Sequence, residues 1–129
     1  MFKFIRQITC YGLLILALAN VLTVHAQDRV TIDRAIRFQR GKISSTVSGR
    51  ISRGTSHIYR VRAREGQQMA VVLKTGNRTS FTISARSAGI LEGADGVRQT
   101  LVELPETGEY EILIGTDATA NYSLEVTIK

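Results

Sequence analysis

The chain has 129 residues, one cysteine, one proline and no tryptophan, and its formal net charge is +6. A chain of this length allows one domain and excludes a multidomain enzyme. Its single cysteine, Cys10, excludes an internal disulfide framework and a cysteine-rich metal site.

The N-terminal segment has the pattern of a secretory signal. Lys3 and Arg6 precede an apolar run of about 14 residues, from Tyr11 to Val24, and Val24-His25-Ala26 places small residues at the two positions that a signal peptidase reads. This run is shorter than the ~20 residues that a membrane-spanning helix needs, which argues against the alternative of an uncleaved anchor. We predict a cleaved signal peptide over 1–26, a single mature domain over 27–129, and a periplasmic or secreted protein with no transmembrane segment after cleavage.

Charge is distributed unevenly along the mature chain. Residues 27–64 hold ten Lys/Arg and two acidic residues, whereas residues 65–129 hold five Lys/Arg and nine acidic residues. Such asymmetry can steer a charged partner, although a solvated face that keeps the protein soluble is the simpler interpretation.

Apolar and polar residues alternate through the first part of the mature chain, with turn residues every 8–12 positions. This period is typical of strands in an all-β sandwich or barrel. The predicted inward rows are, in chain order, Ile36 and Phe38; Val47, Gly49 and Ile51; Tyr59, Val61 and Ala63; Met69, Val71 and Leu73; and Phe81, Ile83 and Ala85.

The glycine-rich stretch 86–98 is predicted to be a long loop with room for one short edge strand. The inward rows then resume with Val102 and Leu104; Tyr110, Ile112 and Ile114; and Tyr122, Leu124, Val126 and Ile128. Eight strands and no amphipathic helix in the mature chain predict an all-β protein with two packed antiparallel sheets.

Several of these rows together resemble a known pattern. Its segments are Ile36-Arg37-Phe38, Val47-Ser48-Gly49-Arg50-Ile51, Tyr59-Arg60-Val61-Arg62-Ala63, Gly66-Gln67-Gln68-Met69, Leu104-Pro105-Glu106-Thr107-Gly108-Glu109-Tyr110-Glu111-Ile112 and Asn121-Tyr122-Ser123-Leu124-Glu125-Val126. From Ile36 to Lys129 the chain resembles the bacterial pre-peptidase C-terminal-like domain and, within that group, is similar to the periplasmic inhibitors of g-type lysozyme.

This resemblance implies a jelly-roll-like antiparallel β-sandwich that works by binding. In the inhibitor family, a long connection rich in Arg and Asn between the last two strands is implicated in engaging the lysozyme cleft. The corresponding connection here, Gly115–Ala120, is short and has small side chains.

The residues that acid–base or nucleophilic chemistry needs are sparse. His57 is the one histidine of the mature chain, and we expect it to be a solvated surface residue. The mature chain has no Gly-x-Ser-x-Gly nucleophile elbow. Glu103, Glu106, Glu109 and Glu111 are dense enough to suggest paired carboxylates, but strand alternation places Glu109 and Glu111 on an outer face. We therefore predict that the protein is not an enzyme.

Metal binding has only weak candidates. Glu92 and Asp95, or Asp117 and Asn121, offer oxygen ligands for calcium without the spacing of an EF-hand. Zinc is less favoured, with one histidine and no cysteine in the mature chain. No cofactor is predicted.

Two surfaces are candidates for binding a partner. Arg60, Arg62 and Arg64 share one predicted strand face and, with Lys42, Arg50 and Arg53, suggest a basic face for anionic envelope polymers or lipid head groups. Its simpler interpretation is solubility and protection of a strand edge. The loops 86–98 and 115–120 offer Glu92, Asp95, Arg98 and Asp117 for contact with a basic lysozyme.

The function predicted from the sequence is therefore a non-catalytic extracytoplasmic binding module, and in its more specific form a lysozyme inhibitor. A structural or accessory envelope protein and a polyanion binder stay as alternatives. We predict no nucleic-acid ligand, because no aromatic residues alternate with the arginines for base stacking.

Overall fold

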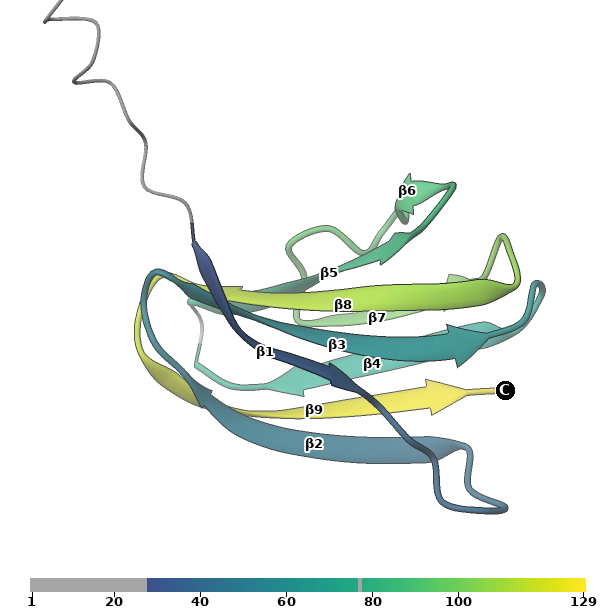
Figure 1. Ribbon diagram of the computed structural model, residues 1–129, viewed down its shortest axis with the longest axis horizontal. Coiled ribbons are helices and arrows are strands. Elements are labelled where there is room, and N and C mark those ends of the chain that lie inside the picture. Colours follow the sequence, from purple (N-terminus) through teal and green to yellow (C-terminus); the bar gives the residue numbers. More distant parts are fainter. Residues whose placement is uncertain (1–27, 77) are drawn as a thin grey trace, which may run out of the picture.

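The computed structural model describes residues 28–76 and 78–129, which form strands joined by turns and loops (Figure 1). The predicted signal peptide and its cleavage site lie outside the described residues. The strands are β1 (Arg29–Ala35), β2 (Ser44–Ile51), β3 (Thr55–Ala63), β4 (Gln68–Lys74), β5 (Thr79–Ala85), β6 (Gly89–Ile90), β7 (Gln99–Glu103), β8 (Gly108–Thr116) and β9 (Ala120–Ile128). Among the described residues, no helix is long and apolar enough to cross a membrane.

The strands form two sheets that pack face to face. The first sheet has the order β1-β3-β8-β5-β6, and the second has the order β2-β9-β4-β7. Neighbouring strands are antiparallel, except that β1 runs parallel to β3. The predicted all-β sandwich is confirmed.

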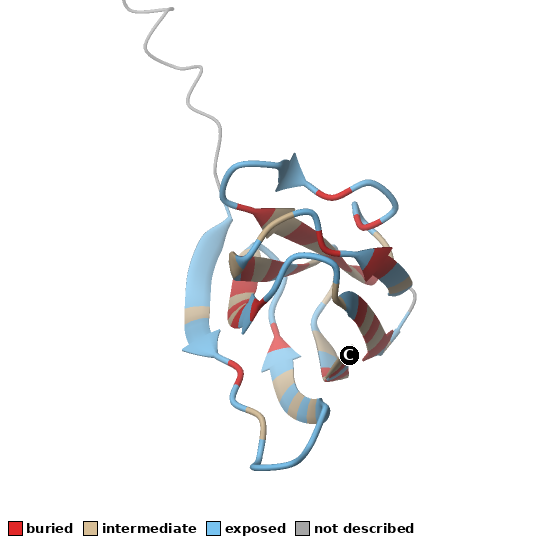
Figure 2. Cartoon of the chain, turned by 90° about the vertical axis from the view of Figure 1, so that its right-hand side faces the viewer, coloured by how far each residue is buried: buried red, intermediate tan, exposed pale blue. Residues whose placement is uncertain are grey.

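The core lies between the sheets and consists mainly of the predicted inward rows, to which the segment 86–98 adds Leu91 and Ala94. Tyr59 and Tyr110 from the first sheet and Met69 and Leu124 from the second are among its fully buried side chains. Along β3, β8 and β9 buried residues alternate with more exposed ones. Figure 2 shows this kind of alternation as red and paler bands across the strands. Each large apolar side chain that is buried in this way contributes ~1.5–3 kcal/mol, which offsets the loss of chain entropy.

The predicted first strand at Ile36 and Phe38 is wrong. The strand lies earlier, at Arg29–Ala35, and Ile32 is its only residue that is not exposed. Because β1 pairs along the edge of β3 and covers little of the core, it carries no alternating apolar row. Ile36 is buried after the strand has ended, and its N–H donates to the carbonyl of Arg60 at 2.7 Å.

The connections gather at two ends of the sandwich. The end formed by 52–54, 117–119 and the start of β5 is called the Asp117 end, since Ile51 pairs with Ala120 and Thr79 with Thr116 there. At the opposite end, called the Phe38 end, lie the connections 36–43, 64–67 and 104–107. Two-residue β6 is the short edge strand that the sequence allowed within 86–98.

Candidate functional site

Arg60 lies at the centre of a charged cluster on the outer face of the first sheet. Its guanidinium donates to both carboxylate oxygens of Asp33 on β1, at 2.7 and 3.0 Å. It also donates to Glu109 at 3.1 Å and to Glu111 at 2.5 Å on β8. Hydrogen bonds to Asp33, Glu109 and Glu111 raise the pKa of Arg60, and the bond from Arg60 lowers the pKa of Asp33.

The charge that is uneven along the sequence is largely evened out in space on this sheet. The arginine-rich strand β3 pairs with the glutamate-rich strand β8, so that Arg60 lies opposite Glu111 and Arg62 opposite Glu109. Residues from the basic and acidic halves of the chain therefore alternate in space. The first sheet presents a mixed face instead of a uniformly positive one.

The predicted basic residues do not form a single face. Arg50 lies on β2 in the second sheet, where its guanidinium donates to Asn121 at 3.5 Å. Arg62 is exposed on the outer face of the first sheet, and Arg64 follows β3 in the turn at the Phe38 end. Only Arg60 and Arg62 of the predicted set share a regular strand face.

The segment 86–98 is held along the edge of β5 by its backbone. Phe81 exchanges two hydrogen bonds with Val97, at 2.8 and 3.0 Å, and the N–H of Ile83 donates to Ala94 at 2.8 Å. Asp95 accepts a hydrogen bond from Thr82 Oγ1 at 3.1 Å. The segment is therefore an anchored surface feature that runs beside the sheet.

Of the other predicted contact residues, Glu92 and Arg98 lie in this segment, and Asp117 lies in the turn between β8 and β9. Glu92 and Arg98 are exposed, and the carbonyl of Arg98 accepts from the N–H of Leu73 near the Asp117 end. The connection containing Asp117 is even shorter than predicted, because β8 extends to Thr116 and β9 begins at Ala120. Arg98 and Asp117 thus lie toward the same end, with Glu92 and Asp95 along the edge.

The prediction that His57 is a solvated surface residue is wrong. His57 is only 2% exposed and faces the core from β3. Its Nδ1 lies 2.6 Å from the hydroxyl of Tyr122, which lies 2.6 Å from the hydroxyl of Tyr59. Burial and the nearby charge of Arg34 lower the pKa of His57, which favours the neutral imidazole. The sequence does carry a sign of this burial. His57 stands two residues before the inward-facing Tyr59, and alternate residues of a strand face the same side.

Gly49 makes room for this polar group in the core. It pairs with Tyr122 across the β2–β9 ladder. A Cβ atom at position 49 would lie 2.7 Å from the hydroxyl oxygen of Tyr122 and 2.9 Å from its Cζ. Tyr122 therefore passes over Gly49 to reach His57 and Tyr59 on the opposite sheet.

These positions favour no catalytic or metal centre. His57 contacts a tyrosine hydroxyl in the core, and Glu109 and Glu111 are paired with Arg60. Within 28–76 and 78–129, no three His, Cys, Asp or Glu side chains gather closely enough to hold a metal ion.

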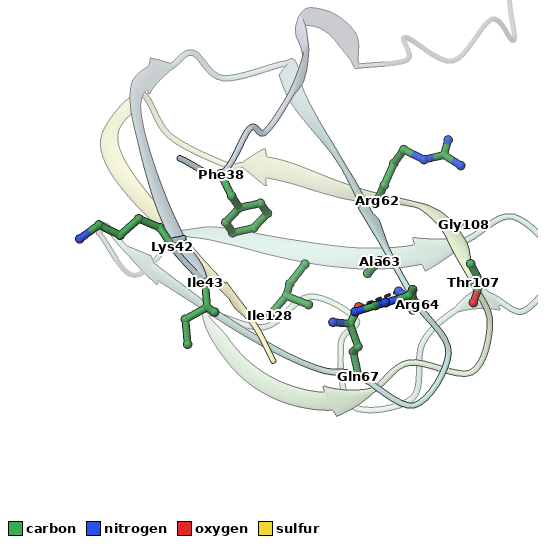
Figure 3. Close-up of a pocket in the computed structure, with 10 residues that line it drawn as sticks. All are labelled: Phe38, Lys42, Ile43, Arg62, Ala63, Arg64, Gln67, Thr107, Gly108 and Ile128. Carbon is green, nitrogen blue, oxygen red and sulfur yellow. Dashed lines mark hydrogen bonds between the residues drawn. The ribbon is translucent and has the colours of Figure 1, made fainter. Parts of the chain in front are cut away.

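A groove of about 380 Å³ opens at the Phe38 end, where β3 and β9 end and β8 begins (Figure 3). Apolar side chains form its floor, and three cationic residues stand around it. Its lining is Phe38, Lys42, Ile43, Arg62, Ala63, Arg64, Gln67, Thr107, Gly108 and Ile128. We call it the Phe38 groove, and the sequence analysis did not predict it, because its walls come from four separate parts of the chain.

Comparisons with known proteins agree on the fold. No protein-family model matches the sequence, and no curated protein sequence matches it. The structure of an Aeromonas hydrophila periplasmic inhibitor of g-type lysozyme superposes with a TM-score of 0.68 and 23% identity, covering 79% of this chain and 99% of that one.

Two further solved structures match over a similar extent. The Salmonella Typhimurium inhibitor of g-type lysozyme gives a TM-score of 0.61 at 22% identity, covering 76% of this chain and 98% of that one. A mutant of the Escherichia coli inhibitor gives 0.62 at 16% identity, covering 78% and 99%. The wider likeness to pre-peptidase C-terminal-like domains stays a prediction. The chain is similar, across its sandwich domain, to the periplasmic inhibitors of g-type lysozyme.

Proposed function

We propose that the mature chain is a non-catalytic periplasmic protein that binds and inhibits a g-type lysozyme. The observation that carries this proposal is the extent of the structural likeness, because the sandwich accounts for 99% of the Aeromonas inhibitor. The signal-like N-terminus supports export to the compartment where such an inhibitor acts.

We place the lysozyme contact on the segment 86–98 together with the turn 117–119. Glu92, Asp95 and Asp117 are exposed there, and acidic groups complement a basic enzyme. The turn of three residues projects little, so it is unsuited to filling a cleft alone. The longer segment, anchored by the β5 edge, supplies a rigid surface beside it.

An envelope polymer is a weaker candidate partner for the arginine strand. Three carboxylates already neutralise Arg60, and Glu109 stands opposite Arg62. A polyanion that approached this face would meet acidic side chains as well as arginines. We therefore give the lysozyme proposal precedence over polymer binding.

The contact surface is tested with charge reversals. In an inhibition assay with a g-type lysozyme, the double variant Glu92→Lys/Asp95→Lys is expected to weaken inhibition by about tenfold or more. Glu125→Lys, on the outer face of β9, is the matched control and should inhibit like the wild type. If the wild type, the double variant and Glu125→Lys inhibited equally, the lysozyme contact would not be on the segment 86–98.

A further inference from the structure

The walls of the Phe38 groove are fixed by hydrogen bonds. The N–H of Arg64 donates to Gln67 Oε1 at 2.7 Å, and the N–H of Glu65 donates to Thr107 Oγ1 at 2.9 Å. Figure 3 shows the first of these bonds as a dashed line. Since these bonds hold the turns 64–67 and 104–107 together, the groove exists before any ligand arrives, which lowers the cost of binding.

The opposite wall is fixed to the second sheet. The N–H of Ile128 on β9 donates to the carbonyl of Ile43 at 2.9 Å, and the turn 39–42 is closed by a bond from the N–H of Lys42 to Gln39 at 2.9 Å. Phe38, Ile43 and Ile128 lie together on this side of the groove (Figure 3). Ile43 is 51% exposed, so apolar surface is left open to solvent at the rim.

The charge around the groove is unbalanced. Lys42, Arg62 and Arg64 are exposed cations, and the lining includes no acidic side chain. In contrast to Arg60, none of these three makes an ion pair with any residue in the described part of the chain. Lys42 and Arg62 extend outward on different sides of the opening (Figure 3). The charges of Lys42 and Arg64 are therefore available to a bound anion. Arg62 stands opposite Glu109 on the β3–β8 pair but forms no ion pair with it, so it adds less to the positive charge of the rim.

We propose that the Phe38 groove binds a single-chain anionic amphiphile, namely a fatty acid. Its acyl chain lies on Phe38, Ile43 and Ile128, and its carboxylate lies at the rim where Lys42, Arg62 and Arg64 stand. The volume is at the lower end of the range for small-molecule sites, which suits one chain better than a folded partner.

This site does not depend on the proposed lysozyme contact. The groove is at the Phe38 end, whereas Asp117 and the Arg98 end of the segment 86–98 are toward the opposite end. Fatty-acid binding and lysozyme inhibition are therefore measured separately, and either can fail without the other.

The test is a titration of the mature, isotope-labelled chain with dodecanoate below its micelle-forming concentration, followed by backbone amide NMR. Saturable shifts are expected at Ala63, Gly108 and Ile128. Acetate has the same head group and dodecyltrimethylammonium an alkyl chain of nearly the same length, and each should bind at least about tenfold more weakly. Absence of saturable shifts, or equal binding of the cationic amphiphile, would overturn the proposal.

A matched pair of variants tests the location. Ile43→Asp places a carboxylate at the rim and should weaken dodecanoate binding by about tenfold. Ile90→Asp makes the same change at a residue on β6 that is 57% exposed, and it should bind like the wild type. If Ile43→Asp also bound like the wild type while keeping the wild-type spectrum elsewhere, the groove would not be the site. An acidic peptide that bound more tightly than dodecanoate would also contradict the proposed ligand class.

Discussion

Tyr122 on the second sheet reaches across the sandwich to His57 on the first, with 2.6 Å between the tyrosine hydroxyl and Nδ1. The same hydroxyl lies 2.6 Å from that of Tyr59. A consistent arrangement has Tyr59 donating to Tyr122 and Tyr122 donating to a neutral His57. Three polar side chains thus satisfy one another inside an apolar core.

Removing the central hydroxyl should destabilise the fold. Tyr122→Phe leaves His57 Nδ1 and the Tyr59 hydroxyl buried without this partner, at an expected cost of about 1–3 kcal/mol. Urea unfolding followed by far-ultraviolet circular dichroism measures the change. An unchanged midpoint would show that the group contributes no net stability.

The absence of a side chain at Gly49 should be equally important. Gly49→Ala places a methyl group against the Tyr122 ring, so we expect a loss of about 1–3 kcal/mol from overpacking. Gly115→Ala is the control, because a Cβ atom there meets nothing within 4 Å and that glycine has no positive φ. Equal effects of the two changes on the urea midpoint would contradict the close approach.

A double-mutant cycle isolates the contact with the hydroxyl. In the Tyr122→Phe background the shortest clash, 2.7 Å to the oxygen, is gone, whereas the ring carbon at 2.9 Å remains. Gly49→Ala should then cost less than in the wild type, by an interaction energy of roughly 0.5–3 kcal/mol. Strict additivity would mean that the oxygen is not the obstacle.

His57 should make stability depend on pH. Its pKa in the folded state is lowered from the ordinary 6.5, so its contribution is fully present above 6.5. As the pH falls below 6.5, the unfolded chain takes up a proton that the folded chain resists, and the free energy of unfolding decreases until the pH passes the folded pKa. The slope from this one group cannot exceed about 1.4 kcal/mol per pH unit.

Urea unfolding at several pH values between 7.5 and 5 would test this dependence. His57→Gln removes the titrating group, and its stability should change less over the same interval. If the variant and the wild type lost stability in parallel, another group would be responsible.

The Arg60 cluster should contribute a salt-dependent part of the stability. Arg60→Gln leaves Asp33, Glu109 and Glu111 to repel one another, so the urea midpoint should fall at low ionic strength. The difference from wild type should shrink as salt screens the carboxylates. Arg62→Gln is the control, because Arg62 has no ion pair with the described residues. A salt-independent loss would point to packing of the arginine stem instead.

The sequence predicted the rows that build the core because burial imposes a period of two on strands that face another sheet. It failed at β1, since an exposed edge strand that pairs parallel to β3 has no such constraint. For His57 the residue type predicts an exposed side chain, whereas its position two residues before the inward-facing Tyr59 on β3 predicts the buried one that the structure has. Pairing between β3 and β8, which combines the basic and acidic halves, depends on contacts about fifty residues apart that no local pattern shows.

The sequence does not show which of the predicted contact residues lie together in space. Arg50 and Arg60 belong to different sheets, and this separation follows from strand order alone. The Phe38 groove joins the connection 36–43 to the turns 64–67 and 104–107, so only the folded chain brings its apolar floor and cationic rim together.

The central claim is tested most directly by measuring g-type lysozyme activity on peptidoglycan while the purified mature chain, residues 27–129, is titrated in. The proposal predicts stoichiometric loss of activity, with full inhibition near one molecule per enzyme. Undiminished lysozyme activity at a large excess of the folded protein would contradict it, and the likeness to the inhibitors would then be one of fold alone.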